Sequence, residues 1–464
     1  MPASPEQALR YAESHLPQTL AALKELATIP SISARPAPDP EVRRSAECIA
    51  AWMKRIGLEK VELLELDGAH PYVYGEHVHA GAALTALLYA HHDVQPIGRE
   101  SHWKSPPFVP TERDGRLYGR GVVDDKAGAA IHLAALEAYL ESGGLPINVK
   151  MIVEGEEEIG SDHLGTFLEQ HRARLDADVI VLTDTANLAS GLPSITYALR
   201  GIVIVDVEVE AIDHPLHSGI WGGPTPDAPL ALCKILGRLI GDDGRVAIPG
   251  FYDDVHELDA EARSRLQALP FDEAVFRSDA GILEGVKLAG EPGRTPYELI
   301  WHRPTVSLSA LEAAPLAGAS NQIVPSARAR VGVRVVPNMD AAKVARQLCD
   351  FLQKDAPWNV RVTTHVRAAA GPWITSPQGP AFEAAERALE KGFGEKAVYI
   401  GCGGSIPFVE PFARVLGGVP ALLIGLEDPV CNAHSENESL LLSDFTKAIK
   451  SAVHLYDELA RLPR

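Results

Sequence analysis

The sequence is short of cysteine and of basic side chains. Its five cysteines are scattered, odd in number and form no CxxC pair, which argues against a disulfide framework and against a thiolate zinc site. We therefore expect a reducing compartment, the cytoplasm. The 43 lysines and arginines face 62 aspartates and glutamates, which gives a net charge of −19. That balance argues against nucleic acid or an anionic membrane as a partner.

Long apolar runs are missing as well. No stretch approaches the length of a membrane span, and the N-terminal segment lacks the basic start and apolar core of a secretory signal. No internal repeat or low-complexity tract is present. With 46% hydrophobic and 23% charged residues, the composition is that of an ordinary globular protein, and 464 residues predict two domains.

Two kinds of strand pattern divide the chain. Wholly apolar runs such as ALTALLYA (83–90) and ALLIGLED (421–428) alternate with helical stretches near both ends. This pattern is typical of a mostly parallel sheet covered by helices on both faces. In the middle, runs such as GIVIVDVEVEA alternate apolar and polar residues, as half-exposed strands do. We predict an α/β domain from residues 1–199 and 394–464, with a smaller α+β domain inserted at 200–393.

Histidines and acidic residues gather where the apolar strands end. The clusters are YAHHDVQP (89–96), YGRGVVDDKAG (118–128), EGEEEIGS (154–161), VLTDT (181–185) and CNAHSE (431–436). In open α/β sheets the ligand crevice forms at the carboxyl ends of the strands, so all five clusters are expected to converge. Each cluster alone is typical of a helix cap or a solvated turn. Their matching placement favours a common site.

The side chains in these clusters suit divalent metal ions. Histidine and carboxylate ligands without thiolates fit zinc, and also manganese or cobalt. Two histidines and three carboxylates suffice for two ions if one carboxylate bridges, and paired ions polarise a carbonyl and activate water. A spare glutamate beside a ligand glutamate could then act as general base. In an extended strand His91 and Asp93 share a face, so Asp93 is placed to orient a metal-binding His91, and His92 points away.

These clusters resemble motifs of the M20 di-zinc peptidases, and in particular of the carnosinase-like dipeptidase branch. The matching motifs follow the family order over nearly the whole chain: HHDVQP, GRGVVDDKAG, EGEEEIGS, TDT, HSGIWGG, ASNQIVP, VRVVP, GGSIP and NAHSENE. The resemblance implies a catalytic domain that carries two metal ions, most often zinc, with an inserted lid and dimerisation domain. Asp184 stands where other branches carry glutamate, which fits the dipeptidase branch.

The resemblance also assigns roles to individual residues of the metal centre. The implied ligands are His91 and Asp184 for one ion, Glu158 and His434 for the other, and Asp124 as the bridge. It implies Glu157 as the general base and Asp93 as the carboxylate behind His91. The family has a non-proline cis peptide bond after the bridging aspartate, which we therefore expect between Asp124 and Asp125.

The resemblance implies substrate contacts as well, several of them in the inserted domain. His217 would reach the active site of the partner subunit in a homodimer and hold the oxyanion, and Asn321, Arg334 and Ser405 would hold the substrate carboxylate or backbone. Two departures concern this pocket. Gly401 and Cys402 stand where carnosinase-like members carry Arg-Glu, and alanines 368–370 stand where they carry a histidine. Both changes leave carnosine-type specificity open.

We predict an M20-type dipeptidase that acts on small dipeptides. An N-acyl-amino-acid amidohydrolase would need the same metal ions and the same recognition of a free carboxylate, so it is the nearest alternative. A metal-dependent binding protein without catalysis would keep the ligands but is expected to lose the base, whereas Glu157 is present.

Overall fold

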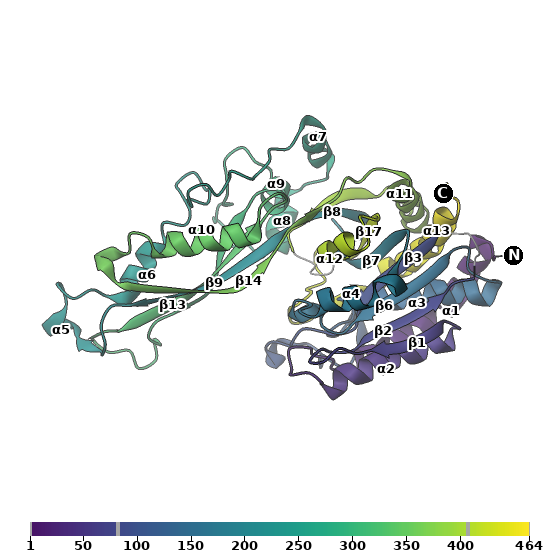
Figure 1. Ribbon diagram of the computed structural model, residues 1–464, viewed down its shortest axis with the longest axis horizontal. Helices are drawn as coiled ribbons and strands as arrows, with labels where there is room; N and C mark the ends of the chain where they lie inside the picture. Colours follow the sequence, from purple (N-terminus) through teal and green to yellow (C-terminus); the bar gives the residue numbers. More distant parts are fainter. Residues whose placement is uncertain (1, 80–83, 405–408, 464) are drawn as a thin grey trace. The chain divides into compact units, whose positions relative to one another are not determined.

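The computed structural model describes residues 2–79, 84–404 and 409–463, which form two compact units (Figure 1). The first unit holds the chain up to Tyr197 together with Ser376–Ile400 and the described residues from 409 onward. The second holds Ala198–Thr375 and the short segment 401–404. The inserted α+β arrangement predicted from the sequence is therefore present.

Nine strands of the described chain form the main sheet. Its order is β1-β2-β6-β3-β7-β17-β8-β15, with β16 also paired to β8. The central strands β6, β3, β7 and β17 run parallel to one another, and antiparallel pairs flank them. The bounds are β1 Glu59–Leu64, β2 Tyr72–His77, β3 Thr85–His91, β6 Asn148–Glu154, β7 Val179–Ala186, β8 Ser194–Leu199, β15 Trp373–Ile374, β16 Val398–Cys402 and β17 Ala421–Glu427.

Helices cover both faces of this sheet, which confirms the predicted fold class. Alternate residues of β3 face opposite layers: Ala86, Leu88 and Ala90 join the core beneath α1, α2, α3, α11 and α13, whereas Tyr89 contacts Phe412 of α12. α4 packs against α12 on that second side. The bounds are α1 Pro5–Ala27, α2 Pro40–Arg55, α3 Lys126–Ser142, α4 Leu164–Leu175, α11 Pro380–Phe393, α12 Val409–Val415 and α13 Leu442–Ala460.

A small antiparallel sheet joins distant parts of the first unit. Its order is β18-β5-β4, where β18 is Ser439–Leu441, β5 is Arg116–Tyr118 and β4 is Thr111–Arg113. Leu440 pairs with Leu117. The segment that follows β17 therefore lies beside the segment that leads into α3. Short 3-10 turns are at η1 Glu100–His102 and η2 Glu157–Ile159.

The second unit is an antiparallel sheet of order β11-β13-β9-β14 with helices α6 and α10 on one face. Burial alternates along β9 as the sequence predicted, and Val203, Val205, Val207 and Val209 point into the core. The bounds are β9 Gly201–Glu210, β10 Leu216–His217, α5 Ser218–Trp221, α6 Ala228–Leu236, α7 Ala260–Ala268, α8 Glu273–Asp279, α9 Pro296–Trp301, β11 Thr305–Glu312, β12 Gln322–Ile323, β13 Ser326–Val335, α10 Ala341–Gln353, η3 Pro357–Asn359 and β14 Arg361–Ala370.

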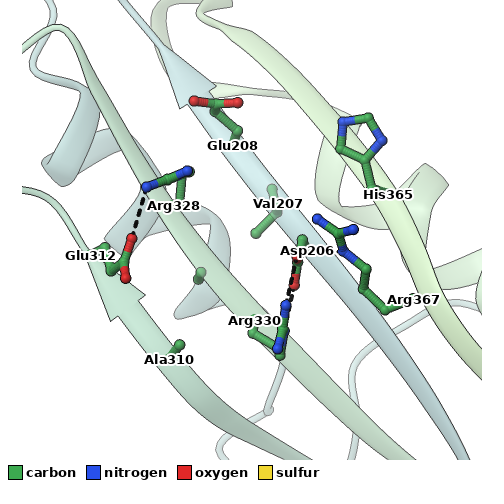
Figure 2. A pocket seen from close by; sticks show the side chains of 10 residues that line it. Asp206, Val207, Glu208, Ala310, Glu312, Arg328, Arg330, His365 and Arg367 are labelled. Atoms are coloured by element: carbon green, nitrogen blue, oxygen red, sulfur yellow. Dashed lines mark hydrogen bonds and ion pairs between the residues drawn. The ribbon is translucent and has the colours of Figure 1, made fainter. Parts of the chain in front are cut away.

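The other face of this sheet is charged and hollowed (Figure 2). Arg330 and Arg367 both pair with Asp206, at 2.6 and 2.7 Å, and Arg328 pairs with Glu312 at 2.9 Å. These side chains line a hollow of about 500 Å³. Opposite charges alternate across neighbouring strands, so each stabilises the other on the solvated face.

The second junction between the units differs from the prediction. We expected the second stretch of the α/β domain to begin at residue 394, but the chain returns to the first unit near residue 375. Helix α11 belongs to the first unit because Ala384, Ala388 and Leu389 pack into its core. None of the described helices is both long and apolar enough to cross a lipid bilayer.

Candidate metal centre

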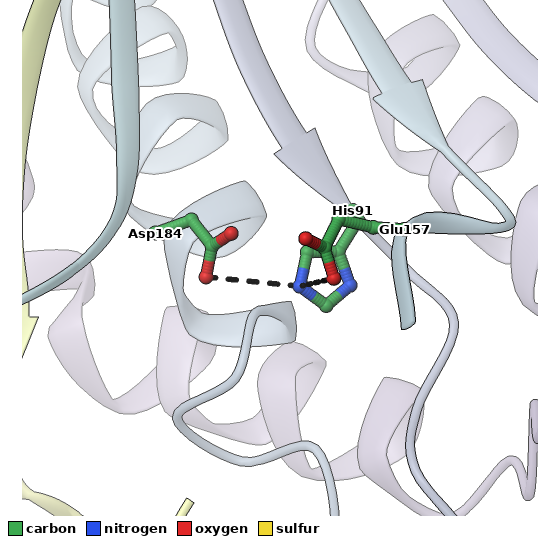
Figure 3. A group of neighbouring side chains, drawn as sticks. All are labelled: His91, Glu157 and Asp184. Atoms are coloured by element: carbon green, nitrogen blue, oxygen red, sulfur yellow. Dashed lines mark ion pairs between the residues drawn. The ribbon is translucent and has the colours of Figure 1, made fainter. Parts of the chain in front are cut away.

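Five strand-end segments of the first unit meet at one place, as the sequence predicted. β3 ends at His91, which pairs in register with Glu154 at the end of β6, and β7 carries Asp184. Because these strands are parallel neighbours, their carboxyl ends share one edge of the sheet. Among the described residues there are three groups in which the donor atoms lie within 4.8 Å of one another: His91, Glu157 and Asp184; Asp124, Glu158 and His434; and Asp124, Asp184 and Glu427. Figure 3 shows the first group.

Asp124 lies between the two histidines. Its Oδ1 is 3.0 Å from Nε2 of His91, and its Oδ2 is 2.8 Å from Nε2 of His434. Glu158 Oε2 is 3.1 Å from the same His434 nitrogen, and Asp184 Oδ1 is 3.7 Å from that of His91. One carboxylate thus presents one oxygen to each half of the cluster. The peptide bond between Asp124 and Asp125 is cis, as expected.

His91 is fully buried and presents one ring nitrogen to the cluster. Its Nδ1 lies 3.1 Å from the carbonyl oxygen of Asp93 and 3.4 Å from that residue's Oδ1. A proton on Nδ1 leaves Nε2 with a free lone pair, and Nε2, although 3.0 Å from Oδ1 of Asp124, forms no hydrogen bond of acceptable geometry. His92 instead contacts the carbonyl oxygen of Pro71, so it points away from the cluster.

Asp93 also holds the loop that carries the paired glutamates. Its two carboxylate oxygens accept the backbone N–H groups of Glu157, at 3.2 Å, and Glu158, at 3.0 Å. Gln95 donates to the carboxylate of Glu158 from its backbone nitrogen, at 3.1 Å, and from its side-chain amide, at 2.8 Å. Gln95 lies within the HHDVQP motif but was not among the residues predicted for the site.

The cluster carries more negative charge than its histidines neutralise. Burial raises the pKa of Glu157 well above its ordinary value and that of Glu158 to about 7. Hydrogen bonds that the His434 ring donates, first to the carboxylate of Asp124 and then to that of Glu158, raise the pKa of His434 to about 11. Burial therefore disfavours the charged form of the glutamates, while the neighbouring carboxylates favour the charged form of His434. A bound cation would relieve this excess of negative charge.

The donor set fits two divalent metal ions that share Asp124. It consists of histidine nitrogens and carboxylate oxygens without thiolates, which zinc, manganese and cobalt accept. The unpartnered Nε2 of His91 is the atom that such an ion would satisfy. The side chains already present supply donor atoms of the kind that both ions need.

Glu427 joins the cluster although the sequence analysis did not select it. It ends β17, and its carboxylate lies within 4.8 Å of donor oxygens of Asp124 and Asp184. Burial, and then the charge of Asp124, raise the pKa of Glu427 well above its ordinary value. The available signal was its position, because it ends an apolar strand just as His91 does.

The remaining candidate residues belong to the second unit. His217 is exposed, and its Nδ1 accepts the backbone N–H of Gly219 at 3.1 Å. The carbonyl oxygen of Asn321 accepts the N–H of Ser218, so Asn321 lies on the same short ribbon, β10-β12. Arg334 is half-buried on β13. Ser405 lies outside the described residues.

The glycine at 401, one of the two departures, has a steric reason. A Cβ atom at this position would lie 2.6 Å from Cβ of Trp301, closer than packed atoms approach. Two residues later, the carbonyl oxygen of Gly403 accepts a hydrogen bond from Nε of Arg200 at 3.0 Å. Trp301 therefore occupies the space that a side chain at 401 would need.

Comparisons with known proteins agree over most of the chain. The family model described as Peptidase family M20/M25/M40 matches residues 87–458. The chain is 33% identical to the cysteinylglycine-S-conjugate dipeptidase of Corynebacterium striatum over 85% of each chain. It is similar to the crystal structure of human carnosine dipeptidase 1, with 28% identity, complete coverage of both chains and a TM-score of 0.86. An M20 family metallo-carboxypeptidase of Sulfolobus solfataricus gives 30% identity, coverage of 96% and 99%, and a TM-score of 0.83. With its strand-end cluster and these matches, the chain belongs to peptidase family M20/M25/M40.

Proposed function

We propose that the protein is a dipeptidase that uses two divalent metal ions, zinc in the first place, to hydrolyse the amide bond of dipeptides. The observation that carries this proposal is the position of Asp124, whose two oxygens face two different histidines at 3.0 and 2.8 Å. Relatives named as dipeptidases match the chain over most or all of their length, which supports the choice of substrate.

The ligand roles are those that the M20 motifs imply, and the donor atoms gathered around each histidine support them. One ion would be held by His91 and Asp184, the other by Glu158 and His434, with Asp124 as the bridge. Two bound ions would polarise the substrate carbonyl and lower the pKa of a water molecule. Asp93 fixes the tautomer of His91 and holds the backbone of the glutamate loop.

Glu157 is the residue that moves the proton. Its Oε2 is 3.9 Å from Nε2 of His91, nearly the same as the 3.7 Å of Asp184, so Glu157 stands beside the proposed ligands, and its role as base comes from its place in the EGEEEIGS motif. It would take the proton from the attacking water and deliver it to the leaving amine. This is the task of a general base that later acts as a general acid.

The second unit supplies substrate recognition and assembly. Arg334, Asn321 and Ser405 would hold the free carboxylate and backbone of a short peptide. Near His217 and Asn321 along the chain, Trp221 is 53% exposed, Ile220 74% and Leu316 95%. Such exposed apolar side chains favour a protein interface. We propose a homodimer in which His217 acts in the site of the partner subunit, in the cytoplasm.

Substrate selection gives the first test of this function. The wild-type enzyme should hydrolyse dipeptides faster than N-acetyl amino acids with the same C-terminal residue. Amidation of the dipeptide removes the carboxylate that Arg334 is proposed to bind, so kcat/KM should fall about 10–100-fold, the value of a charge-assisted hydrogen-bond pair. Faster hydrolysis of the N-acetyl amino acids would instead identify an amidohydrolase.

Variants of the same strand make this test specific. Arg334→Ala should lower kcat/KM for the free dipeptide by a similar factor. It should leave kcat/KM for the amidated dipeptide unchanged. Arg330→Ala is the matched control, because Arg330 lies on the same face of β13 as Arg334 but is held in an ion pair with Asp206. Equal losses for the two variants, or an amide penalty that persists in Arg334→Ala, would contradict the proposed role of Arg334.

A further inference from the structure

Arg120 and Glu438 form a buried ion pair beside the metal centre. Arg120 is 1% exposed and Glu438 is fully buried. Nη1 of Arg120 donates to Oε2 of Glu438 at 2.7 Å, across 318 positions of sequence. Neither side chain belongs to a donor group of the centre. A buried pair of this kind is costly to desolvate and gives weak evidence for stability by itself.

The carboxylate of Glu438 fixes the backbone that leads to Asp124. Its Oε2 accepts the N–H of Gly121 at 2.9 Å, and its Oε1 accepts the N–H groups of Val123, at 3.1 Å, and Asp124, at 3.3 Å. Gly121 has a φ of +78°, and a Cβ atom there would collide with the side chain of Val94. The turn is therefore tightly defined, and Glu438 satisfies its inward-facing donors.

The guanidinium of Arg120 reaches two further segments of the centre. Nη2 donates to the carbonyl oxygen of Pro96 and to that of Ser435, both at 3.1 Å. Pro96 closes the segment that begins with His91, and Ser435 directly follows His434. The ion pair is thus bonded to three segments that carry proposed metal ligands.

We propose that the Arg120–Glu438 pair positions the metal centre by setting the spacing between the segments of His91, Asp124 and His434. Asp124 can face both histidines only if these three backbones keep their separation. The inference rests on the ligand roles of the proposed function. Arg120 and Glu438 act as positioning residues, since they reach the ligands through the backbone.

Metal affinity separates a positioning role from a merely structural one. Wild type and Glu438→Gln are stripped of metal and titrated with Zn²⁺ in competition with a chromophoric chelator, and the melting temperature of each metal-free protein is recorded. Glu438→Gln should bind Zn²⁺ about 10–100-fold more weakly, as loss of an outer partner of a metal ligand does.

Glu458→Gln is the matched control. Glu458 is 4% exposed on α13 and accepts a hydrogen bond from Nε of Arg387 on α11 at 2.8 Å, so the same substitution removes a similar pair away from the ligand segments. It should lower the melting temperature but leave Zn²⁺ affinity unchanged. Arg120→Lys keeps the charge but loses the planar fork whose two Nη atoms bond Glu438, Pro96 and Ser435 at once. It should weaken Zn²⁺ binding too, and it carries the test if Glu438→Gln does not fold.

The outcomes distinguish the two levels of the argument. If wild type binds two ions and Glu438→Gln and Arg120→Lys bind them equally well, the pair is only structural and the inference is wrong. If both control and test variants lose affinity in proportion to their melting temperatures, the inference is equally wrong. If wild type itself does not bind two ions, the proposed function fails, and the inference fails with it.

Discussion

Glu157→Gln is expected to lower kcat by about 10²–10⁴-fold while the protein keeps both metal ions, because the amide cannot accept a proton from the attacking water. Glu158→Gln is the matched control. Glu158 Oε2 lies 3.1 Å from Nε2 of His434, whereas Glu157 lies no closer than 3.9 Å to His91. The Glu158 variant should therefore lose metal. Steady-state kinetics and elemental analysis of both purified variants make the comparison.

The opposite pattern would overturn the assignment of roles. If Glu157→Gln lost metal and Glu158→Gln retained it, the base and the ligand would be exchanged by one position. Glu157 and Glu158 are adjacent in η2, and the backbone N–H groups of both donate to Asp93. The experiment therefore has to distinguish the two side chains.

His217→Ala is expected to lower kcat by about 10²–10³-fold, the effect of losing one oxyanion donor. The neighbouring His214→Ala is the control: His214 is also exposed and its ring bonds to the adjacent Asp213, so this substitution should leave kcat unchanged. Because His217 is proposed to act in the partner's site, the inactive variants His217→Ala and Glu157→Gln should complement each other.

Mixing Glu157→Gln with His217→Ala tests that arrangement. In a two-fold dimer each mixed pair has one complete site, with Glu157 from one chain and His217 from the other. Complete random exchange should therefore restore about a quarter of the wild-type activity. Exchange is followed with an affinity tag on one variant. If tagged mixed dimers form but stay inactive, action in the partner's site is refuted.

The convergence of the histidines and carboxylates was predictable because its signals are local. The period of two in a strand puts His91 and Asp93 on one face, and the parallel arrangement of apolar strands brings their ends together. Glu427 carries the same positional signal, but one acidic residue after an apolar run is more often a turn residue. No sequence pattern marks Gln95, since an amide that bonds to a ligand cannot be distinguished in the sequence from any other polar loop residue.

Long-range packing explains what the sequence did not indicate. Arg120 and Glu438 meet only because β5 and β18 pair across the chain, and no local pattern records that pairing. The predicted junction at 394 lies later in the chain than the observed one near 375. The apolar face of α11 suits either unit, and only its contacts show to which it belongs. The glycine at 401 acquires its reason only from Trp301, a hundred positions away.

Metal stoichiometry is the most direct test of the central claim, that two divalent ions share Asp124. Metal-free protein is titrated with Zn²⁺, Mn²⁺ or Co²⁺ while bound metal is measured by elemental analysis and activity by hydrolysis of a dipeptide. Activity should appear in full only when two ions are bound per chain, and a chelator should abolish it. Full activity with a single ion per chain, or activity that survives complete removal of metal, would contradict the account.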